Sequence, residues 1–259
     1  MPKILGIVNL TPDSFYAPSR TDPGQICDVV RKMLDDGAWA VDLGAVSTRP
    51  GSSPVPLEEE WERLSPALGA LAREMPGVRV SIDTFNSEIV RRAFDVIGPF
   101  AVNDISAGQM DPEMLPLTGR LGLPYIAMHM HGSPVAPSPT HGDVVEDVIR
   151  YFREFTLKAA DAGISEWYLD PGFGFSKSVE QNWEVLHRLS ELQCIGRPIL
   201  VGISRKSMIW KRYGITPSEA LPATRDAHVL ALKQGAEVLR VHDVADAANT
   251  IRQLYPNEF

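Results

Sequence analysis

The segment Val78–Asp83 reads VRVSID, a short apolar run that ends at an acid. The next such run, Phe100–Asp104, reads FAVND and also ends in polar residues. Short runs rich in Val and Ile that alternate with longer amphipathic stretches are typical of βα units around a parallel sheet. The two segments therefore predict neighbouring parallel strands, each of which ends in side chains able to bind a ligand.

The same pattern recurs along the chain on both sides of these segments and gives eight βα units. Strands are expected at residues 4–8, 40–43, 78–82, 101–103, 125–128, 167–169, 199–203 and 238–241. Helices are expected between them, for example at residues 25–36, 57–74, 144–162 and 179–192. The length of 259 residues is close to the roughly 250 that one (β/α)₈ barrel needs, so we expect a single domain over residues 1–259.

Alternating strands and helices also occur in an open, doubly wound sheet, so the residues at the strand ends decide between the two architectures. Almost every expected strand ends in a polar or glycine-containing cluster: Asn9, Asp42 with Gly44, Asp83, Asn103 with Asp104, His129, Asp170, residues 204–207 and residues 240–243. In a closed barrel these ends all face one mouth, whereas in an open sheet most lie far from the crevice. One polar end can mean only that the chain leaves the core there. Eight in succession favour a (β/α)₈ TIM barrel with its active site at the C-terminal ends of the strands.

The composition narrows the class of protein. With 44% hydrophobic and 22% charged residues the chain resembles an ordinary globular protein, and a net charge of -8 argues against a general nucleic-acid binder. The N-terminal residues lead directly into the first strand without a signal-like apolar segment, so we expect a cytoplasmic protein that does not enter a membrane. Only Cys27 and Cys194 are present, which predicts neither a disulfide framework nor a zinc site.

Three loops carry cationic side chains, two of them together with hydroxyl groups. Residues 202–207 read GISRKS and residues 240–243 read RVHD, at the ends of the seventh and eighth strands. Loops at these positions of a barrel often bind phosphate, so we expect an anion site there, with solvated surface charge as the alternative. Residues 47–51, STRPG, suit either a loop that closes over an anion or an ordinary surface turn.

Other strand ends carry acids, amides and imidazoles. Asp83, Asn103 and Asp170 could together read the edge of a nitrogen heterocycle, although any one of them could be structural. Asn9 could offer an amide oxygen to a hard cation, or only shape the turn that follows it. His129 and His131 are not assigned to a metal, because alternate residues of a strand point to opposite faces and no third ligand stands at a telling spacing.

Taken together, these clusters resemble the dihydropteroate synthase family, in the same order and over almost the whole chain. The segments that carry the resemblance are GIVNLTPDSF at residues 6–15, SRKS at 204–207 and RVHD at 240–243. The resemblance implies a transferase of folate biosynthesis that joins 6-hydroxymethyl-7,8-dihydropterin pyrophosphate to p-aminobenzoate, with Mg²⁺ as cofactor and pyrophosphate as leaving group. It also implies a homodimer formed through helices away from the mouth, and a target of sulfonamides.

The resemblance further implies a role for each matching residue. Asp83, Asn103 and Asp170 would hydrogen-bond the pterin ring edge, and Asn9 would help hold Mg²⁺ on the pyrophosphate. The other expected pterin contacts are Lys206, Gly202 and the apolar Ile105, Met128 and Phe175. The expected p-aminobenzoate contacts are Phe15, Thr48, Pro50, Ser207 and again Lys206. The residues expected to act directly in catalysis are Asn9, Arg49, Lys206, Arg240 and His242, with Arg49, Arg240 and His242 on the pyrophosphate oxygens.

Two loops depart from the family pattern. Residues 16–19 read YAPS where many members have Ser-Asp-Gly-Gly, and residues 44–48 read GAVST where the common form is Gly-Gly-Glu-Ser-Thr. Each change removes a loop carboxylate. Two alternatives therefore stay open: a pterin-binding paralogue without catalytic activity, and a barrel that serves a pterin-dependent methyltransferase.

Overall fold

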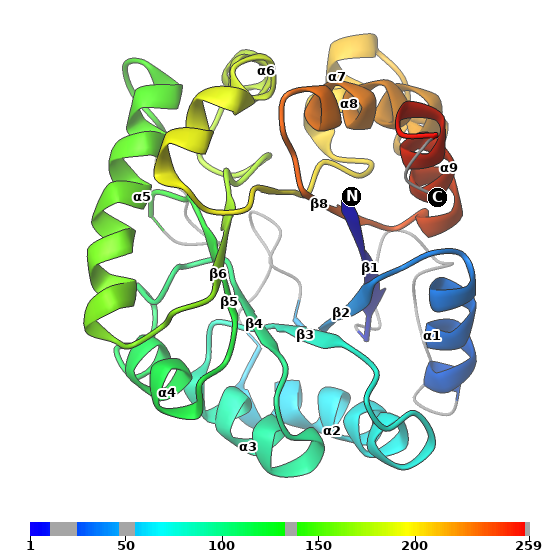
Figure 1. Ribbon diagram of the computed structural model, residues 1–259, viewed down its shortest axis with the longest axis vertical. Helices are drawn as coiled ribbons and strands as arrows, with labels where there is room; N and C mark the ends of the chain where they lie inside the picture. Colours follow the sequence, from blue (N-terminus) through cyan, green and yellow to red (C-terminus); the bar gives the residue numbers. More distant parts are fainter. Residues whose placement is uncertain (11–24, 47–54, 133–138, 257–259) are drawn as a thin grey trace.

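The computed structural model describes residues 1–10, 25–46, 55–132 and 139–256. Its eight parallel strands follow one another in the order β6-β5-β4-β3-β2-β1-β8-β7. A single bridge between Leu169 and Ile199 joins the two outermost strands, so the sheet closes on itself. The helices form a ring around the strands (Figure 1). The expected (β/α)₈ barrel is confirmed.

The strand bounds agree with the sequence pattern to within one residue except at the third strand, which begins at Val80 and not at Val78, and at the seventh. They are β1 Lys3–Asn9, β2 Ala40–Gly44, β3 Val80–Asp83, β4 Ala101–Asp104, β5 Tyr125–Met128, β6 Trp167–Asp170, β7 Leu200–Val201 and β8 Val238–Val241. The seventh strand is therefore shorter than the expected 199–203. It is followed at once by Gly202, where the chain turns toward residues 204–207.

The described helices lie between and after the strands. They are α1 Ile26–Asp35, α2 Leu57–Glu74, α3 Ser87–Ile97, α4 Met114–Leu121, α5 Val144–Asp161, α6 Val179–His187, α7 Ser207–Tyr213, α8 Leu221–Lys233 and α9 Val244–Leu254, with 3₁₀ turns η3 Leu189–Ile195 and η4 Pro217–Glu219. The helix expected at 179–192 thus ends at His187 and is followed by a 3₁₀ turn. Among the described helices, none is long and apolar enough to cross a membrane.

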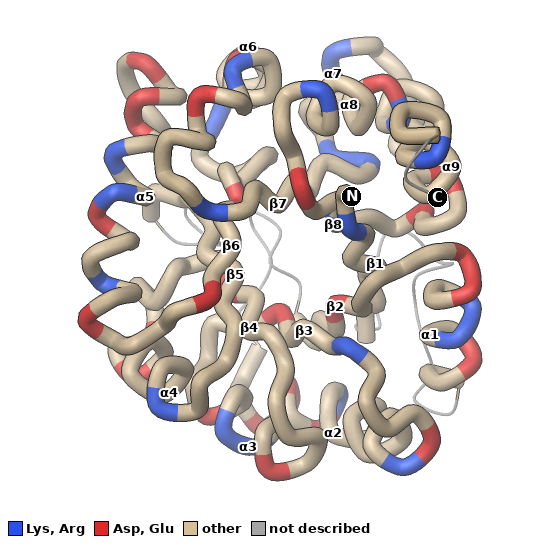
Figure 2. The backbone as a smooth tube through the Cα atoms, viewed as in Figure 1, with Lys and Arg blue, Asp and Glu red and all other residues tan. Residues whose placement is uncertain are grey.

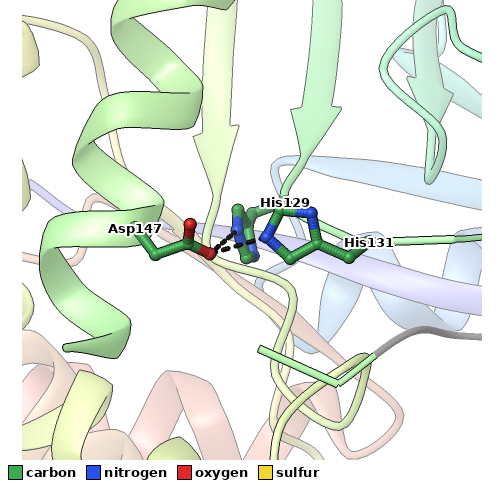
Figure 3. A group of neighbouring side chains, drawn as sticks. All are labelled: His129, His131 and Asp147. Atoms are coloured by element: carbon green, nitrogen blue, oxygen red, sulfur yellow. Dashed lines mark hydrogen bonds and ion pairs between the residues drawn. The ribbon is translucent and has the colours of Figure 1, made fainter. Parts of the chain in front are cut away.

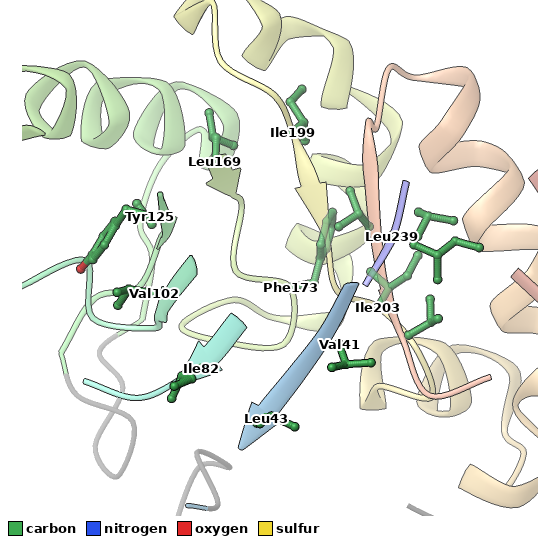
Figure 4. Close-up of a cluster of buried hydrophobic side chains, with 14 of the residues drawn as sticks. Val41, Leu43, Ile82, Val102, Tyr125, Leu169, Phe173, Ile199, Ile203 and Leu239 are labelled. Carbon is green, nitrogen blue, oxygen red and sulfur yellow. The ribbon is translucent and has the colours of Figure 1, made fainter. Parts of the chain in front are cut away.

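Alternation along each strand separates the core from the site. On β2, Val41 and Leu43 belong to the large apolar cluster beneath the helices, several of whose members are drawn in Figure 4, whereas Asp42 between them is fully buried on the opposite face. Leu239 and Val241 flank Arg240 in the same way on β8. Because successive strand side chains point to opposite faces, Asp42 and Arg240 both face the barrel interior.

A second apolar layer closes the interior below these polar residues. Its buried members come from six strands: Leu5, Ala40, Ile126, Tyr168, Leu200 and Val238. Ala40 stands two residues before Asp42, and Val238 two residues before Arg240, so the layer lies one inward position further from the mouth. The barrel is therefore filled with apolar side chains at the bottom, and ligand-binding groups converge at the top.

The outer surface carries charges of both signs. Figure 2 shows Lys and Arg interspersed with Asp and Glu over the outer helices. Many are neighbours on one helix, such as Arg91 with Glu88 and Lys32 with Asp36. Such exposed pairs each stabilise the fold by about 0–1 kcal/mol at most. An anionic ligand must therefore meet the local cations of the barrel mouth.

Candidate active site

The polar floor of the mouth is a network of two carboxylates and one guanidinium. Arg240 donates from Nε to Asp42 Oδ2 at 2.6 Å and from one terminal nitrogen to Asp83 Oδ2 at 2.7 Å. Asn103 donates its amide to Asp42 Oδ2 at 3.0 Å, and the Ser81 hydroxyl donates to Asp42 Oδ1. Strands β2, β3, β4 and β8 each contribute to this network, so its geometry is set by the barrel itself.

Asp83 differs from Asp42 in having an oxygen to spare. Its Oδ1 is buried and has no hydrogen-bond partner in the described part of the chain. Burial and, to a smaller extent, the neighbouring Asp42 carboxylate together raise the pKa of Asp83 to about 7, against the pull of Arg240. Two carboxylates that share one guanidinium cannot both be fully compensated. The spare oxygen of Asp83 is therefore the natural partner for an N–H donor on a ligand.

Asp170 and Lys206 supply a second polar group at the mouth. Asp170 Oδ1 accepts from the backbone N–H of Gly172 at 2.8 Å, and burial raises the pKa of its carboxyl group. Lys206 donates from Nζ to the carbonyl oxygen of Phe173 at 2.6 Å, and its ammonium lies 4.9 Å from the centre of the Phe175 ring. Burial lowers the pKa of Lys206 to about 8. Lys206 therefore keeps a cation beside the mouth near neutral pH.

Two glycines lie at the edge of this floor. A Cβ placed on Gly202 would lie 3.8 Å from Asp170 Oδ2 and 3.9 Å from Arg240 Cβ, so these side chains border the same point. A Cβ placed on Gly44 would lie 3.8 Å from Asp83 Oδ2 and 3.9 Å from Asn9 Oδ1. The expected pocket residue Gly202 and the expected metal ligand Asn9 thus both border the polar floor.

An apolar wall stands beside the polar groups. The buried side chains of Ile105, Met128, Met130 and Phe175 form one cluster, with Phe85 packed against it. The three residues expected as apolar pterin contacts are therefore brought together. A flat ring held between this wall and the floor would meet carboxylates at its edge and hydrophobic atoms on its face.

The loops after β7 and β8 contact each other, but their cations do not all face one anion. Arg205 donates from Nε to Asp243 Oδ2 at 2.8 Å and from a terminal nitrogen to Asp243 Oδ1 at 3.0 Å. His242 Nδ1 lies 3.1 Å from the hydroxyl of Ser204. Ser207 begins α7 next to Lys206. Arg205 thus clamps the two loops together, whereas Lys206 is turned to the loop after β6.

Four expected site residues lie outside the described residues: Phe15, Thr48, Arg49 and Pro50. The same is true of the altered segment at residues 16–19. Their roles stay predictions. The described members of the expected site nevertheless come from seven different strands or strand ends and meet at one mouth.

Asp42 and Ser81 belong to the floor but were not among the expected contacts. The signal for Asp42 was available, since a charged residue stands between apolar neighbours on an inward position of a strand. The signal for Ser81 was weak, because a small hydroxyl residue is tolerated in many strands. What the sequence could not show is that Arg240, 198 positions away, lies against Asp42.

The two histidines after β5 form a second polar cluster. β5 ends at Met128, and both imidazoles point to Asp147 of α5 (Figure 3). Asp147 Oδ2 lies 3.1 Å from His129 Nε2 and 2.6 Å from His131 Nε2, so the expectation that these rings lie on opposite faces is wrong. Residues two apart share a face even in a strand, and both histidines follow the end of β5. Two imidazoles and a carboxylate could hold a transition metal ion. However, Arg150 already pairs with Asp147, and Lys177 lies 2.8 Å from His129 Nδ1.

The fold and the site together define a class of protein: a (β/α)₈ barrel whose mouth gathers buried carboxylates, an amide and cations beside an apolar wall. Residues 5–242 match the family model described as pterin binding enzyme. Dihydropteroate synthase of Escherichia coli is 39% identical over an alignment of 261 residues, gaps included, which covers 97% of this chain and 90% of that protein. Dihydropteroate synthase of Haemophilus influenzae is 37% identical, with 97% of this chain and 92% of that protein covered.

Solved structures agree with this classification. Yersinia pestis dihydropteroate synthase with a sulfonamide drug superposes with a TM-score of 0.92 at 34% identity and covers 99% of this chain and 94% of that one. The Xanthomonas albilineans synthase with 4-aminobenzoic acid gives a TM-score of 0.88 at 35% identity over 99% of this chain and 93% of that one. The Thermus thermophilus synthase in complex with 6HMPPP gives a TM-score of 0.84 at 34% identity over 99% of this chain and 94% of that one. The chain belongs to the dihydropteroate synthase family of pterin binding enzymes.

Proposed function

We infer that this chain is a dihydropteroate synthase, which condenses 6-hydroxymethyl-7,8-dihydropterin pyrophosphate with p-aminobenzoate. The observation that carries the inference is the spare carboxylate oxygen of Asp83, buried beside Arg240 and Asn103 in a chain of this family. A reduced pterin offers ring and amino N–H donors to such an oxygen. An analogue without these donors would leave the buried Asp83 oxygen unpaired, which is the basis of strong discrimination.

The ligands of related structures support the two substrates. The Xanthomonas albilineans structure holds 4-aminobenzoic acid, and the Thermus thermophilus structure holds 6HMPPP. The described floor of the present mouth offers acceptors at Asp83 and Asp170 and an ammonium at Lys206. We assign the pterin ring to this floor and to the apolar wall formed by Ile105, Met128 and Phe175.

The reaction needs stabilised charge more than it needs a nucleophile from the protein. The bond from the pterin methylene carbon to the diphosphate oxygen breaks and leaves its electron pair on that oxygen. The amine nitrogen of p-aminobenzoate forms the new bond to the carbon and loses a proton. Lys206, Arg240 and His242 place positive or hydrogen-bonding groups around the mouth, where they would stabilise the charge that develops on the leaving group.

Magnesium is the cofactor that we propose for this step. The carboxamide oxygen of Asn9 lies at the end of β1 next to Gly44 and Asp83, and an amide oxygen is a hard ligand that suits Mg²⁺. Mg²⁺ usually takes only one or two protein ligands and completes its shell with phosphate oxygens and water. When bound, it would neutralise charge on the pyrophosphate oxygens.

We also propose that the protein acts in the cytoplasm as a homodimer, with helices on the side away from the mouth at the interface. Both proposals rest on the family resemblance. Sedimentation of the purified chain at several concentrations measures the oligomeric state directly. A single species of monomer mass across the range would refute the dimer.

The experiment that tests the proposed function uses labelled p-aminobenzoate and dihydropterin pyrophosphate with the purified full chain, with and without added Mg²⁺. Labelled dihydropteroate that forms only with Mg²⁺ is the expected result. Pterin binding without product would favour a paralogue without catalytic activity. Transfer of a methyl group from a methylated pterin to a corrinoid, without condensation, would favour the methyltransferase alternative.

A further inference from the structure

A buried group behind the mouth takes no part in the chemistry above. It joins Lys177, at the end of the loop after β6, to His129 and to Asp147 of α5. We propose that Lys177 is a positioning residue of the synthase reaction, which holds the loop at residues 171–177 in the shape that presents Asp170 and Phe175 to the pterin. The proposal rests on the proposed function.

Two lysines donate to carbonyl groups of the loop. Lys177 donates from Nζ to the carbonyl oxygen of Gly172 at 3.2 Å and to that of Phe175 at 3.3 Å. Lys206 donates to the carbonyl oxygen of Phe173, which stands between these two. Three carbonyl groups of the loop are therefore held by two ammonium groups. A change in the curvature of the loop would move the acceptor of Lys206 and the ring of Phe175 together.

The loop also sits directly against the backbone that follows β5. Gly172 has a φ of 71°, and a Cβ placed there would lie only 2.0 Å from the carbonyl oxygen of His129. The N–H of His129 in turn donates to the carbonyl oxygen of Asp170 at 2.9 Å. His129 therefore contacts the loop in two ways: its backbone N–H donates to Asp170, and its imidazole accepts from Lys177.

The hydrogens of this group can be assigned from its acceptors. A carboxylate only accepts, so Asp147 requires a hydrogen on His129 Nε2, and His129 Nδ1 is left as an acceptor for Lys177. Burial lowers the pKa of His129 to about 4, so this imidazole is neutral. The ammonium of Lys177 then gives its three hydrogens to three acceptors: His129 Nδ1 and the carbonyl oxygens of Gly172 and Phe175.

The same assignment of hydrogens favours a chain of hydrogen bonds from Asp147 through His129 to Lys177, called the relay below, over a metal site. A metal on His129 Nε2 would require a hydrogen on Nδ1, which would then face the ammonium of Lys177. Arg150 brings a second cation, which pairs with Asp147. Two cations thus flank a cluster that has one carboxylate. That arrangement favours anchoring of Lys177 over capture of a divalent cation.

Burial lowers the pKa of Lys177 to about 7, through loss of solvation and the nearby Lys206, while Asp170 and Asp147 favour the charged form.

The carbonyl oxygen of Gly172 also accepts from the backbone N–H of Phe175, so the lysine reinforces a turn that the backbone already makes. Methionine has a similar length but no donor. It would leave His129 Nδ1 without its hydrogen-bond donor and would free the loop to change shape.

Three variants of the full chain test the proposal: Lys177→Met, Lys177→Arg and, as control, Lys158→Met on the exposed face of α5. Michaelis constants for both substrates, kcat and thermal unfolding are measured for each. We expect Lys177→Met to raise the KM for dihydropterin pyrophosphate about tenfold or more, with a smaller change in the KM for p-aminobenzoate. Lys177→Arg restores part of the affinity, and Lys158→Met matches the parent chain.

A purely structural role would give a different result. Loss of folded protein lowers kcat but leaves the KM of the remaining enzyme unchanged, and that outcome for Lys177→Met would overturn the proposal. If Lys177→Met does not fold, Asp147→Ala carries the test, since it removes the acceptor that anchors His129 from a helix outside the mouth. A pterin KM raised about threefold supports the relay, and an unchanged KM contradicts it. Turnover by the parent chain tests the proposed function separately.

Discussion

Asp83 is the residue at which burial and charge are most finely balanced. It shares Arg240 with Asp42, and its Oδ1 has no partner in the described residues. Burial raises its pKa from 3.8 to about 7. Because the folded pKa lies above the unfolded one, protonated Asp83 stabilises the ligand-free protein below pH 3.8, and this contribution is lost as the pH rises through about 7. The ligand-free site therefore favours the neutral form of Asp83, whereas a bound pterin needs the ionised form.

The first prediction concerns binding of the pterin as a function of pH. N–H donors of the ring pair best with ionised Asp83, so affinity for the pterin should fall as the pH drops below about 7, by up to about tenfold per pH unit. Asp83→Asn should weaken binding by about 1–3 kcal/mol and remove this pH dependence, because the amide does not titrate. Calorimetry from about pH 5 to about pH 8, a range that spans the raised pKa, measures both effects. If Asp83→Asn binds the pterin as tightly as the parent chain, the assignment of Asp83 to the pterin edge is refuted.

At the scale of elements, the sequence pattern predicts the strands but not the shape of the loop after β6. The alternation of apolar and polar residues predicts both faces of β2 and β8, including the inward Asp42 and Arg240. The shape of residues 171–177 depends instead on Lys177 and His129, which lie 48 positions apart. Contacts of this kind leave no periodic pattern in the sequence, so only the three-dimensional structure shows them.

The second prediction concerns Gly172 in that loop. Gly172→Ala meets a backbone oxygen at 2.0 Å in addition to an unfavourable φ of 71°, so we expect it to destabilise the fold and to weaken pterin binding about tenfold or more. Gly196→Ala is the matched control, since Gly196 has a φ of 70° and nothing within 4 Å of its added Cβ. It should cost about 1 kcal/mol of stability without changing pterin affinity. Urea unfolding and pterin titration compare the two variants. Equal effects would mean that the contact with His129 is unimportant.

At the scale of the whole molecule, the eightfold pattern and the polar strand ends suffice to predict the barrel and the position of its mouth. They do not predict how firmly the barrel closes. Strands β1 and β2 pair over five residues each, whereas β6 and β7 are joined by one bridge, from Leu169 to Ile199, and β7 has two residues. Pro198 accepts from Leu169 at this seam, but as a proline it donates no backbone hydrogen bond. The weakest seam of the barrel thus lies directly below Asp170 and Gly202.

The last prediction follows from the position of that seam. Local opening requires the loss of few hydrogen bonds there, so amides that bond across the seam, such as that of Leu169, should exchange with deuterium faster than those of β1 and β2. Asp170 follows one side of the seam and Gly202 the other, and both border the pterin floor. Bound pterin would hold the two sides together and should slow exchange at the seam more than in β1 and β2. Hydrogen exchange followed by mass spectrometry, with and without pterin, measures the difference. If the seam exchanges as slowly as β1 and β2 in the ligand-free protein, its few hydrogen bonds do not limit the stability of the barrel, and ligand binding does not act through its closure.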